Sequence, residues 1–374
     1  TAVPFEDPRV KTATRRGFIT YAAGMSVAAS VIAAGSHALA RRGSEDLRTE
    51  VVLPSVRRTA AERSATTTTT TEGPWTPIPG LSSWITPNDD FYRIDTALLV
   101  PRVDPASWSM SIEGLVATRL EFTLDDLLGM DLVDVAVTLN CVSNEVGGHL
   151  VGNAIWTGVP LADLLAEAGP TAGAQQVMAW SVDGFNAGFP MAAVMDGRTA
   201  LVAVGMNGEP LPFRHGFPAR LIVAGLYGYV SAVKWLDRIQ LTTLDDDGYW
   251  IPRGWAKYGP IKIASRIDVP VGSAVPAGRQ PIAGVAWAPV SGVGGVEVSV
   301  DDGPWTACRL LQRSAPGRPG DSWVQWFLAW DAEPGAHVLR VRAHDTDGRV
   351  QPPGPKPIAP DGAEGYHTRL IRAV

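Results

Sequence analysis

The stretch Val135-Ala136-Val137-Thr138-Leu139-Asn140-Cys141-Val142-Ser143-Asn144-Glu145 places one cysteine between an apolar run and a polar segment. The alternating, β-branched first half is typical of a strand, with Val135, Val137 and Leu139 on one side. The polar second half, closed by Gly147-Gly148, predicts a loop. We therefore expect Cys141 at the mouth of a strand, where a soft metal or an electrophile can reach the thiol. A lone cysteine is also often a small buried hydrophobe, and on this run alone the inert interpretation is favoured.

The composition is that of a globular protein with enough apolar residues for a large core. The chain has 374 residues, of which 45% are hydrophobic and 19% are charged, and this length favours two or three domains. The 39 glycines and 30 prolines indicate many loops and strands. A net charge of −6, without a basic stripe of interleaved aromatic residues, argues against a nucleic-acid partner. The two cysteines, Cys141 and Cys308, exclude a multi-cysteine zinc or iron–sulfur site.

Residues 1–40 are expected to lie outside the soluble core. Arg15-Arg16 precede an uncharged stretch from Gly17 to Ala40. This pattern fits a twin-arginine export signal with a cleavage site at Ala38-Leu39-Ala40, or a transmembrane helix with charged flanks. The polar residues before Arg15 slightly favour a retained anchor, so we expect residues 17–40 to lie in the cell membrane. The folded domains would then be extracytoplasmic, or exported if the signal is cleaved.

Three further segments follow this stretch. Residues 41–83 predict a linker, because the unbroken threonines 66–71 and the proline-rich residues after them cannot bury enough apolar area to become ordered. Residues 84–263 mix short strands with short helices and predict an α+β domain. Residues 264–374 carry strands and turns at the spacing of an all-β, immunoglobulin-like sandwich, for which we expect a role in recognition or assembly.

Several local patterns define the α+β domain more closely. Thr123 is predicted to cap a short helix, and Trp156–Pro160 reads as a turn before a second helix. The strand before Asn207-Gly208 is predicted to turn there into a hairpin. Neither GxGxxG nor GxxxxGK stands at a strand–helix junction, which leaves Rossmann and P-loop nucleotide sites unsupported.

A second informative stretch runs from Met206 to Arg220 and is followed by Val233-Lys234-Trp235. His215, Arg220 and Lys234 stand there among apolar strands, and a buried cation without an anion is costly. No matching Asp or Glu lies in this segment, which favours a bound ligand that carries phosphate. Three unrelated residues on a solvated sheet edge are the alternative.

Together these motifs resemble the sulfite oxidase family of molybdopterin-dependent oxidoreductases. The resemblance is carried by Leu139–Asn144, Trp156–Leu161, the Met206–Arg220 stretch and Val233–Trp235, in matching order and at matching intervals. It extends from about residue 84 to the end, because the β-rich tail is similar to the molybdenum-cofactor dimerisation domain of that family. The resemblance therefore implies a sulfite-oxidase-type catalytic domain, a molybdenum–molybdopterin cofactor and a possible homodimer.

The family also implies roles for individual residues. Cys141 would be the thiolate bound to molybdenum and the catalytic centre, as befits a soft ligand. The cofactor-binding positions implied by the resemblance are Tyr92, Arg93, Asp183, His215, Arg220, Ala232, Val233 and Lys234. The metal would supply the two-electron oxygen-atom chemistry, and the protein would supply orientation and charge.

Departures from the family pattern bear on the substrate. Sulfite-oxidising members carry arginines after the Cys-x-x-Asn motif, where this chain has Glu145 and Val146, and an acid would repel sulfite. A tyrosine that the family usually carries near its active site aligns with Phe185. The chain shows no haem-binding segment, so a separate electron-transfer partner is expected.

We therefore expect an oxidoreductase that transfers an oxygen atom to or from a small or protein-borne sulfur compound. A reductase of sulfoxides or N-oxides on the same centre is an alternative within enzymes, and turnover with an artificial electron donor or acceptor separates the two. A membrane-tethered binding module without catalysis is the alternative outside enzymes, and stably folded protein without metal would favour it.

Overall fold

The computed structural model describes residues 47–56, 78–311 and 316–374. The chain divides into a unit of residues 1–50 and a compact unit from Val51 to Val374, and the second unit is described below. The predicted apolar helix of residues 17–40 and most of the predicted linker of residues 41–83 lie outside the described residues. Among the helices that are described, none is both long enough and apolar enough to cross a membrane.

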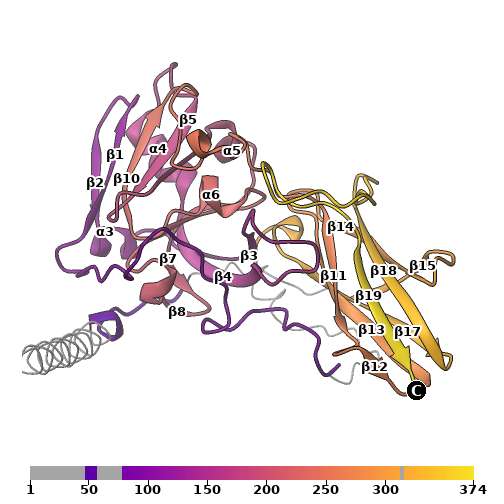
Figure 1. Ribbon diagram of the computed structural model, residues 1–374. Helices are drawn as coiled ribbons and strands as arrows, with labels where there is room; N and C mark the ends of the chain where they lie inside the picture. The colour runs from indigo at the N-terminus through magenta and orange to yellow at the C-terminus, as the bar shows by residue number, and fades with distance from the viewer. Residues whose placement is uncertain (1–46, 57–77, 312–315) are drawn as a thin grey trace, which may run out of the picture. The chain divides into compact units, whose positions relative to one another are not determined.

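Two five-stranded sheets follow residue 100 (Figure 1). The first has the order β2-β1-β10-β5-β6, in which β1 and β10 are parallel and the other neighbours are antiparallel. Its strands are β1 (Ser109–Gly114), β2 (Leu120–Thr123), β5 (Gln176–Ser181), β6 (Asn186–Pro190) and β10 (Leu236–Thr242). The second has the order β3-β4-β7-β8, with β9 also paired to β7. Its strands are β3 (Val133–Asn140), β4 (Val151–Pro160), β7 (Ala200–Met206), β8 (Glu209–Pro210) and β9 (Arg220–Val223).

The helices between these strands are short. They are α3 (Leu124–Leu128), α4 (Leu161–Ala168), α5 (Ala192–Met195) and α6 (Gly228–Ser231). Thr123 caps α3 through a reciprocal capping box with Asp126, which confirms the predicted cap. The interpretation of Trp156–Pro160 as a turn was wrong, because these residues end β4 and pair with β7. The hairpin at Asn207-Gly208 is confirmed, and both residues have the positive φ that such a turn needs.

The second sheet is buried on both faces, and this accounts for its nearly unbroken apolar sequences. Successive side chains of a strand point to opposite faces. In β7, Val202 and Val204 therefore pack into the core shared with the first sheet, whereas Leu201 and Ala203 pack into a second core with Trp156. Strand β3 carries Cys141 at its end and is likewise buried from Val135 to Asn140.

The C-terminal region consists of two further sheets. One has the order β11-β13-β17-β16 and the other β12-β19-β18-β14-β15. A single core of side chains from both sheets, including Trp326 of one and Val341 of the other, shows that they pack face to face (Figure 1). The strands are β11 (Ala264–Val269), β12 (Ala274–Val275), β13 (Gly278–Trp287), β14 (Val293–Val300), β15 (Thr306–Ala307), β16 (Arg309–Leu311), β17 (Val324–Ala332), β18 (Gly335–Asp345) and β19 (His367–Ala373).

A buried polar network joins β3 and β4 to the C-terminal region. The Thr138 hydroxyl donates to Asn153 Oδ1 at 2.9 Å and accepts from the backbone N–H of Trp323 at 2.8 Å. Asn153 Nδ2 donates to the carbonyl of Trp84 at 3.0 Å, and Trp323 Nε1 donates to the same carbonyl at 2.7 Å. These groups are desolvated, so each needs its partner, and the network fixes β3 against the C-terminal sheets.

Replacing Asn153 with alanine should destabilise the protein strongly. The change leaves the buried Thr138 hydroxyl without its acceptor and removes one of the two donors to Trp84. We expect a loss of about 3 kcal/mol in the free energy of unfolding, measured by urea denaturation. Asn186→Ala is the control, because Asn186 bonds Tyr249 through its backbone carbonyl. Equal small losses in both variants would contradict this account of the network.

The stability should also fall in mild acid because of His367. Burial and the nearby Arg369 and Arg266 charges lower the pKa of His367 to about 4, from an ordinary value of 6.5. Between these values the unfolded chain binds the proton and the folded chain does not, so the free energy of unfolding falls as the pH drops from about 6.5 to about 4. His367→Gln should flatten this part of the stability–pH curve, and an unchanged slope would count against it.

Candidate functional site

Cys141 follows the last residue of β3, as the sequence predicts, and lies at the edge of a cleft. Its backbone N–H donates to the Leu150 carbonyl at 2.9 Å, which closes the loop between β3 and β4. Burial raises the pKa of the thiol, and the Ser143 N–H, 3.4 Å from Sγ, partly offsets this. An amide aimed at the sulfur favours the thiolate, which is the form that binds metals.

The loop after Cys141 is a compact double turn. Asn144 N–H donates to the Cys141 carbonyl at 3.0 Å, and Asn144 Oδ1 accepts from Leu150 N–H at 2.8 Å. Glu145 and Val146 line a small separate cavity of about 20 Å³, together with Asn140, rather than the cleft of Cys141. Glu145, the acid that the sequence places shortly after the cysteine, therefore does not line the cleft of Cys141.

The cleft has a volume of about 90 Å³, larger than the 20 Å³ of the cavity beside Glu145, and it is open to solvent at its mouth. It brings together most of the residues predicted for the site. Its lining includes Tyr92, Cys141, Asp183, His215, Arg220, Ala232 and Lys234. Two predicted residues lie outside the lining. Val233 is fully buried in the main core, and Arg93 contacts the lining residue Asp95.

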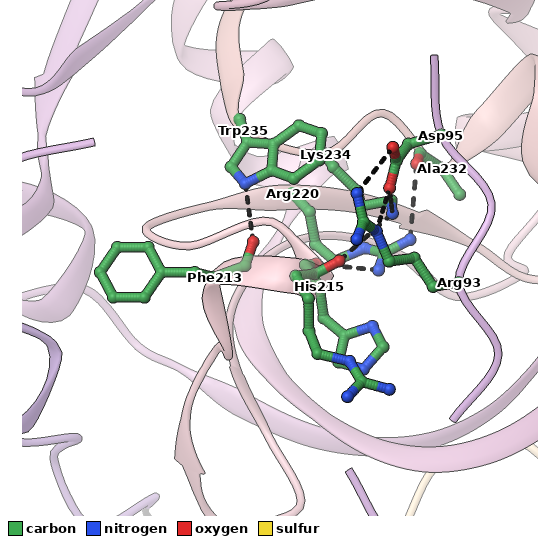
Figure 2. A network of polar contacts seen from close by, with 9 residues as sticks. Arg93, Asp95, Phe213, His215, Arg220, Ala232, Lys234 and Trp235 are labelled. Carbon is green, nitrogen blue, oxygen red and sulfur yellow. Dashed lines mark hydrogen bonds and ion pairs between the residues drawn. The ribbon is translucent and has the colours of Figure 1, made fainter. Parts of the chain in front are cut away.

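Arg220 is the deepest charge in the cleft. It begins β9, is 4% exposed, and its guanidinium lies over the Trp156 ring at 5.0 Å. Its two Nη atoms donate to the carbonyls of His215 at 2.9 Å and Ala232 at 3.4 Å, and Nε has no partner among the described residues (Figure 2). Burial lowers the pKa of Arg220 to about 10, so it remains charged at neutral pH. Such a cation calls for an anionic ligand.

Lys234 has a carboxylate partner that sequence reasoning missed. Its Nζ lies 2.9 Å from Asp95 Oδ2, and Arg93 Nε reaches the same oxygen at 2.7 Å (Figure 2). Burial would raise the pKa of Asp95, but the hydrogen bonds and charges of Arg93 and Lys234 outweigh it and hold that pKa below its usual range. Burial and the Arg220 charge lower the pKa of Lys234 to about 8. Of these two cations, Lys234 has an anionic partner, whereas Arg220 has only carbonyl partners among the described residues.

A strained turn directs Lys234 into the cleft. Trp235 has a φ of +50°, unusual for a bulky residue, and its indole N–H donates to the Phe213 carbonyl at 2.8 Å (Figure 2). Gly216, at φ +112°, lies so close that a Cβ there would be 3.1 Å from the Lys234 backbone. This close packing holds the 213–216 turn against Lys234, and the turn also carries His215.

His215 is a neutral acceptor rather than a cation. Burial, and to a lesser extent the Arg220 charge, lower its pKa to about 3. Its Nε2 lies 2.9 Å from the Asn88 carbonyl, and a carbonyl can only accept, so Nε2 carries the proton. Nδ1 is then an acceptor, suited to a ring N–H of a bound heterocycle. The sequence analysis grouped His215 with the hydrogen-bond donors to a ligand. In this tautomer Nε2 donates to Asn88, and Nδ1 is an acceptor.

The cleft also has an aromatic side, of which the sequence indicated Phe185 alone. Phe185, Tyr229 and Trp250 line it. Phe185 lies 5.7 Å from the ring of Tyr249, and Trp250 lies 5.1 Å from the same ring. The dense aromatic residues of positions 249–258 were the available signal. Tyr92 lies beside Cys141, and burial followed by the Cys141 charge raises its pKa well above the ordinary value.

The described residues therefore offer a thiol for a soft metal, a buried cation for phosphate and an acceptor for a heterocyclic N–H. Among the described residues the Arg220 guanidinium has only neutral carbonyls as hydrogen-bond partners, so its buried charge is not balanced by an anion there. No cluster of three or more histidine, cysteine or carboxylate ligands occurs in the described part of the chain, so a metal here would depend on a cofactor for its other ligands.

Comparisons with known proteins agree with this chemistry. Residues 97–250 match the family model of the oxidoreductase molybdopterin binding domain. The chain is 30% identical over 325 residues to mitochondrial sulfite oxidase of Homo sapiens, covering 74% of this chain and 59% of that protein. It is 30% identical over 335 residues to sulfite oxidase of Arabidopsis thaliana, covering 73% of this chain and 83% of that protein. The chain thus spans less than two thirds of the human relative.

A solved structure is similar as well. The sulfane dehydrogenase SoxCD from Paracoccus pantotrophus superposes with a TM-score of 0.66 and 25% identity, over 85% of this chain and 93% of that chain. The thiol, the buried guanidinium with only carbonyl partners and the neutral imidazole suit the molybdenum–molybdopterin cofactor that these matches imply. The chain belongs to the sulfite oxidase family of molybdopterin-dependent oxidoreductases.

Proposed function

We propose that the protein transfers an oxygen atom to or from a sulfur compound at a molybdenum centre bound by Cys141. One observation carries the proposal: Cys141 and Arg220, a buried cation whose partners among the described residues are neutral carbonyls, line the same cleft. The thiol suits a soft metal, and the guanidinium suits the phosphate of a molybdopterin. When bound, this cofactor would supply two-electron oxygen-atom chemistry.

The residues of the chain would hold and orient the reaction partners. The Ser143 N–H would favour the thiolate of Cys141. Arg220 would hold the phosphate end, with Lys234 beside it in its ion pair with Asp95, and His215 Nδ1 would accept from a pterin N–H. Asp183 lines the cleft from the β5–β6 turn, where its carboxylate is available to a ring nitrogen. Tyr92, with its raised pKa, stays protonated and is a hydrogen-bond donor beside the sulfur.

The cleft favours an uncharged organic sulfur group over an inorganic oxyanion. Arg220 and Lys234 would be engaged by cofactor and Asp95, and the remaining lining includes Ile94, Phe185 and Trp250. Aromatic and aliphatic side chains bind apolar groups, and they offer no positive charge to stabilise a sulfite dianion. A sulfoxide or N-oxide reductase on the same centre is the alternative direction, because the same lining would accept the oxidised substrate.

The setting of the enzyme is part of the proposal. We place residues 84–263 as the cofactor-binding domain and residues 264–374 as an immunoglobulin-like domain, supported by the two packed sheets of that region. The uncharged stretch of residues 17–40 supports a membrane tether or export, with the folded domains extracytoplasmic. Electrons would pass to or from a separate partner, and a homodimer through the C-terminal sheets is consistent with the family.

The first test compares wild type with Cys141→Ser, both produced in a host that makes the cofactor. The wild type should hold close to one molybdenum per chain by elemental analysis, and the serine variant should lose the metal–thiolate absorption and nearly all turnover with an artificial donor or acceptor. Cys308→Ser is the matched control, since Cys308 lies in the C-terminal region. Well-folded wild type without metal would refute the enzyme proposal and favour a binding module.

The substrate class is tested by truncating the aromatic side of the cleft. Trp250→Ala should lower kcat/KM for a neutral organic sulfoxide or thioether about five-fold, because an aromatic contact is worth about 1 kcal/mol. Trp305→Ala, in the C-terminal region under Arg342, is the control and should leave kcat/KM unchanged. A wild type that prefers sulfite to every neutral compound, with Trp250→Ala unaffected, would exclude this substrate class.

A further inference from the structure

One arginine of the C-terminal region reaches back to the loop that follows Cys141. Arg266 lies in β11 and is 4% exposed. Each branch of its guanidinium has a different partner: Nη1 donates to the Gly148 carbonyl at 2.8 Å, Nη2 to Ser82 Oγ at 2.8 Å, and Nε to Asp268 Oδ1 at 2.7 Å. Asp268 Oδ2 in turn accepts from the Ser82 backbone N–H at 3.1 Å. The buried charge is therefore fully paired and joins three separate segments.

The Gly148 carbonyl is the point at which the loop can be held from outside. Gly148 N–H already donates to the Glu145 carbonyl at 2.9 Å, so the second turn of the loop ends at this peptide. The first turn begins at Cys141, whose Sγ accepts from Ser143 N–H. Asn144 ends the first turn by bonding Cys141, its Oδ1 bonds Leu150 just after the second turn, and a Cβ on Gly148 would lie 2.6 Å from that Oδ1. A shift of Gly148 is therefore passed through Asn144 to the amide that faces the sulfur.

A second contact holds the same loop from the side. Gly147 has a φ of +77°, and a Cβ there would lie 2.4 Å from the His367 ring, so the loop backbone packs directly on the imidazole. His367 is fixed in turn, because its Nδ1 accepts from the Ile267 N–H at 2.9 Å. Arg266 in β11 and His367 in β19 thus contact adjacent residues of the loop, one from each sheet of the C-terminal region.

We propose that Arg266 is a positioning residue for the metal-binding thiolate, holding the loop 142–148 so that the Ser143 amide stays on the Cys141 sulfur. The proposal rests on the proposed function, in which Cys141 binds molybdenum. It gives the C-terminal region a direct part in the active site. An arginine suits the task because its planar fork satisfies three acceptors in fixed directions, which a lysine cannot do.

The test uses the full chain with its cofactor and the double variant Arg266→Met/Asp268→Asn. The second change avoids leaving a buried carboxylate without its cation, which by itself could unfold the protein. Arg342→Met/Glu297→Gln is the matched control, because Arg342 and Glu297 form an ion pair between β18 and β14 of the same region at 2.8 Å. Both variants lose one ion pair of the C-terminal sheets, and only one of them loses the loop contact.

Two readouts are compared. Amide hydrogen exchange of residues 143–150 should become about ten-fold faster in the Arg266 variant, the effect of losing one hydrogen bond to a charged group, and should not change in the control. The metal–thiolate absorption band should shift in the Arg266 variant alone. Unchanged exchange in the loop would overturn the proposal, and so would faster exchange without a spectral shift.

The failure of the proposed function would look different. Wild-type protein without molybdenum would refute Cys141 as a metal ligand, and the positioning role would fall with it even if the exchange result showed that Arg266 anchors the loop. Metal-loaded wild type with equal spectra in all variants would leave the function standing and refute the role of Arg266.

Discussion

The burial of β3 on both faces is the constraint on which the site depends. One face, with Val135, Val137 and Leu139, packs into a core with Trp156, and Thr138 on the other face bonds Trp323 of the C-terminal region. A strand held in this way cannot change register, because a shift by one residue would exchange its two faces. The position of Cys141 in the cleft is therefore fixed by the register of β3 relative to the other residues of the lining.

The electrostatics of the cleft follow from the same burial. Three basic side chains of the cleft differ in their charge and partners. His215 is neutral, and Lys234 is paired with Asp95. Arg220 is charged and has only carbonyl partners. Repulsion among them is reduced because only two of the three are charged. The remaining unsatisfied group is a guanidinium, which is the strongest available recognition element for a phosphate.

The C-terminal region contributes to the site through backbone contacts. Trp323 and Arg266 bind polar groups of β3 and of the loop after it, and a small hydrophobic core with Val142, Tyr227 and Trp287 lies between the same segments. A domain that served only for assembly would have no need of such contacts. This arrangement links the stability of the C-terminal sheets to the geometry of the thiol.

The sequence by itself determined the elements that local chemistry specifies: the strand before Cys141, the cap at Thr123, the hairpin at Asn207-Gly208 and the strands of the C-terminal sheets. It also determined the family, since the motifs are contiguous, and through it a set of residues most of which line one cleft. Only the tertiary structure decided the pairing of Lys234 with Asp95, the tautomer of His215, the direction of Glu145 and the reach of Arg266. These features join residues that are distant in sequence or depend on burial, and a periodic pattern carries no information on either. The turn expected at Trp156–Pro160 failed for the same reason, because pairing with β7 outweighed the local signal of Gly158 and Pro160.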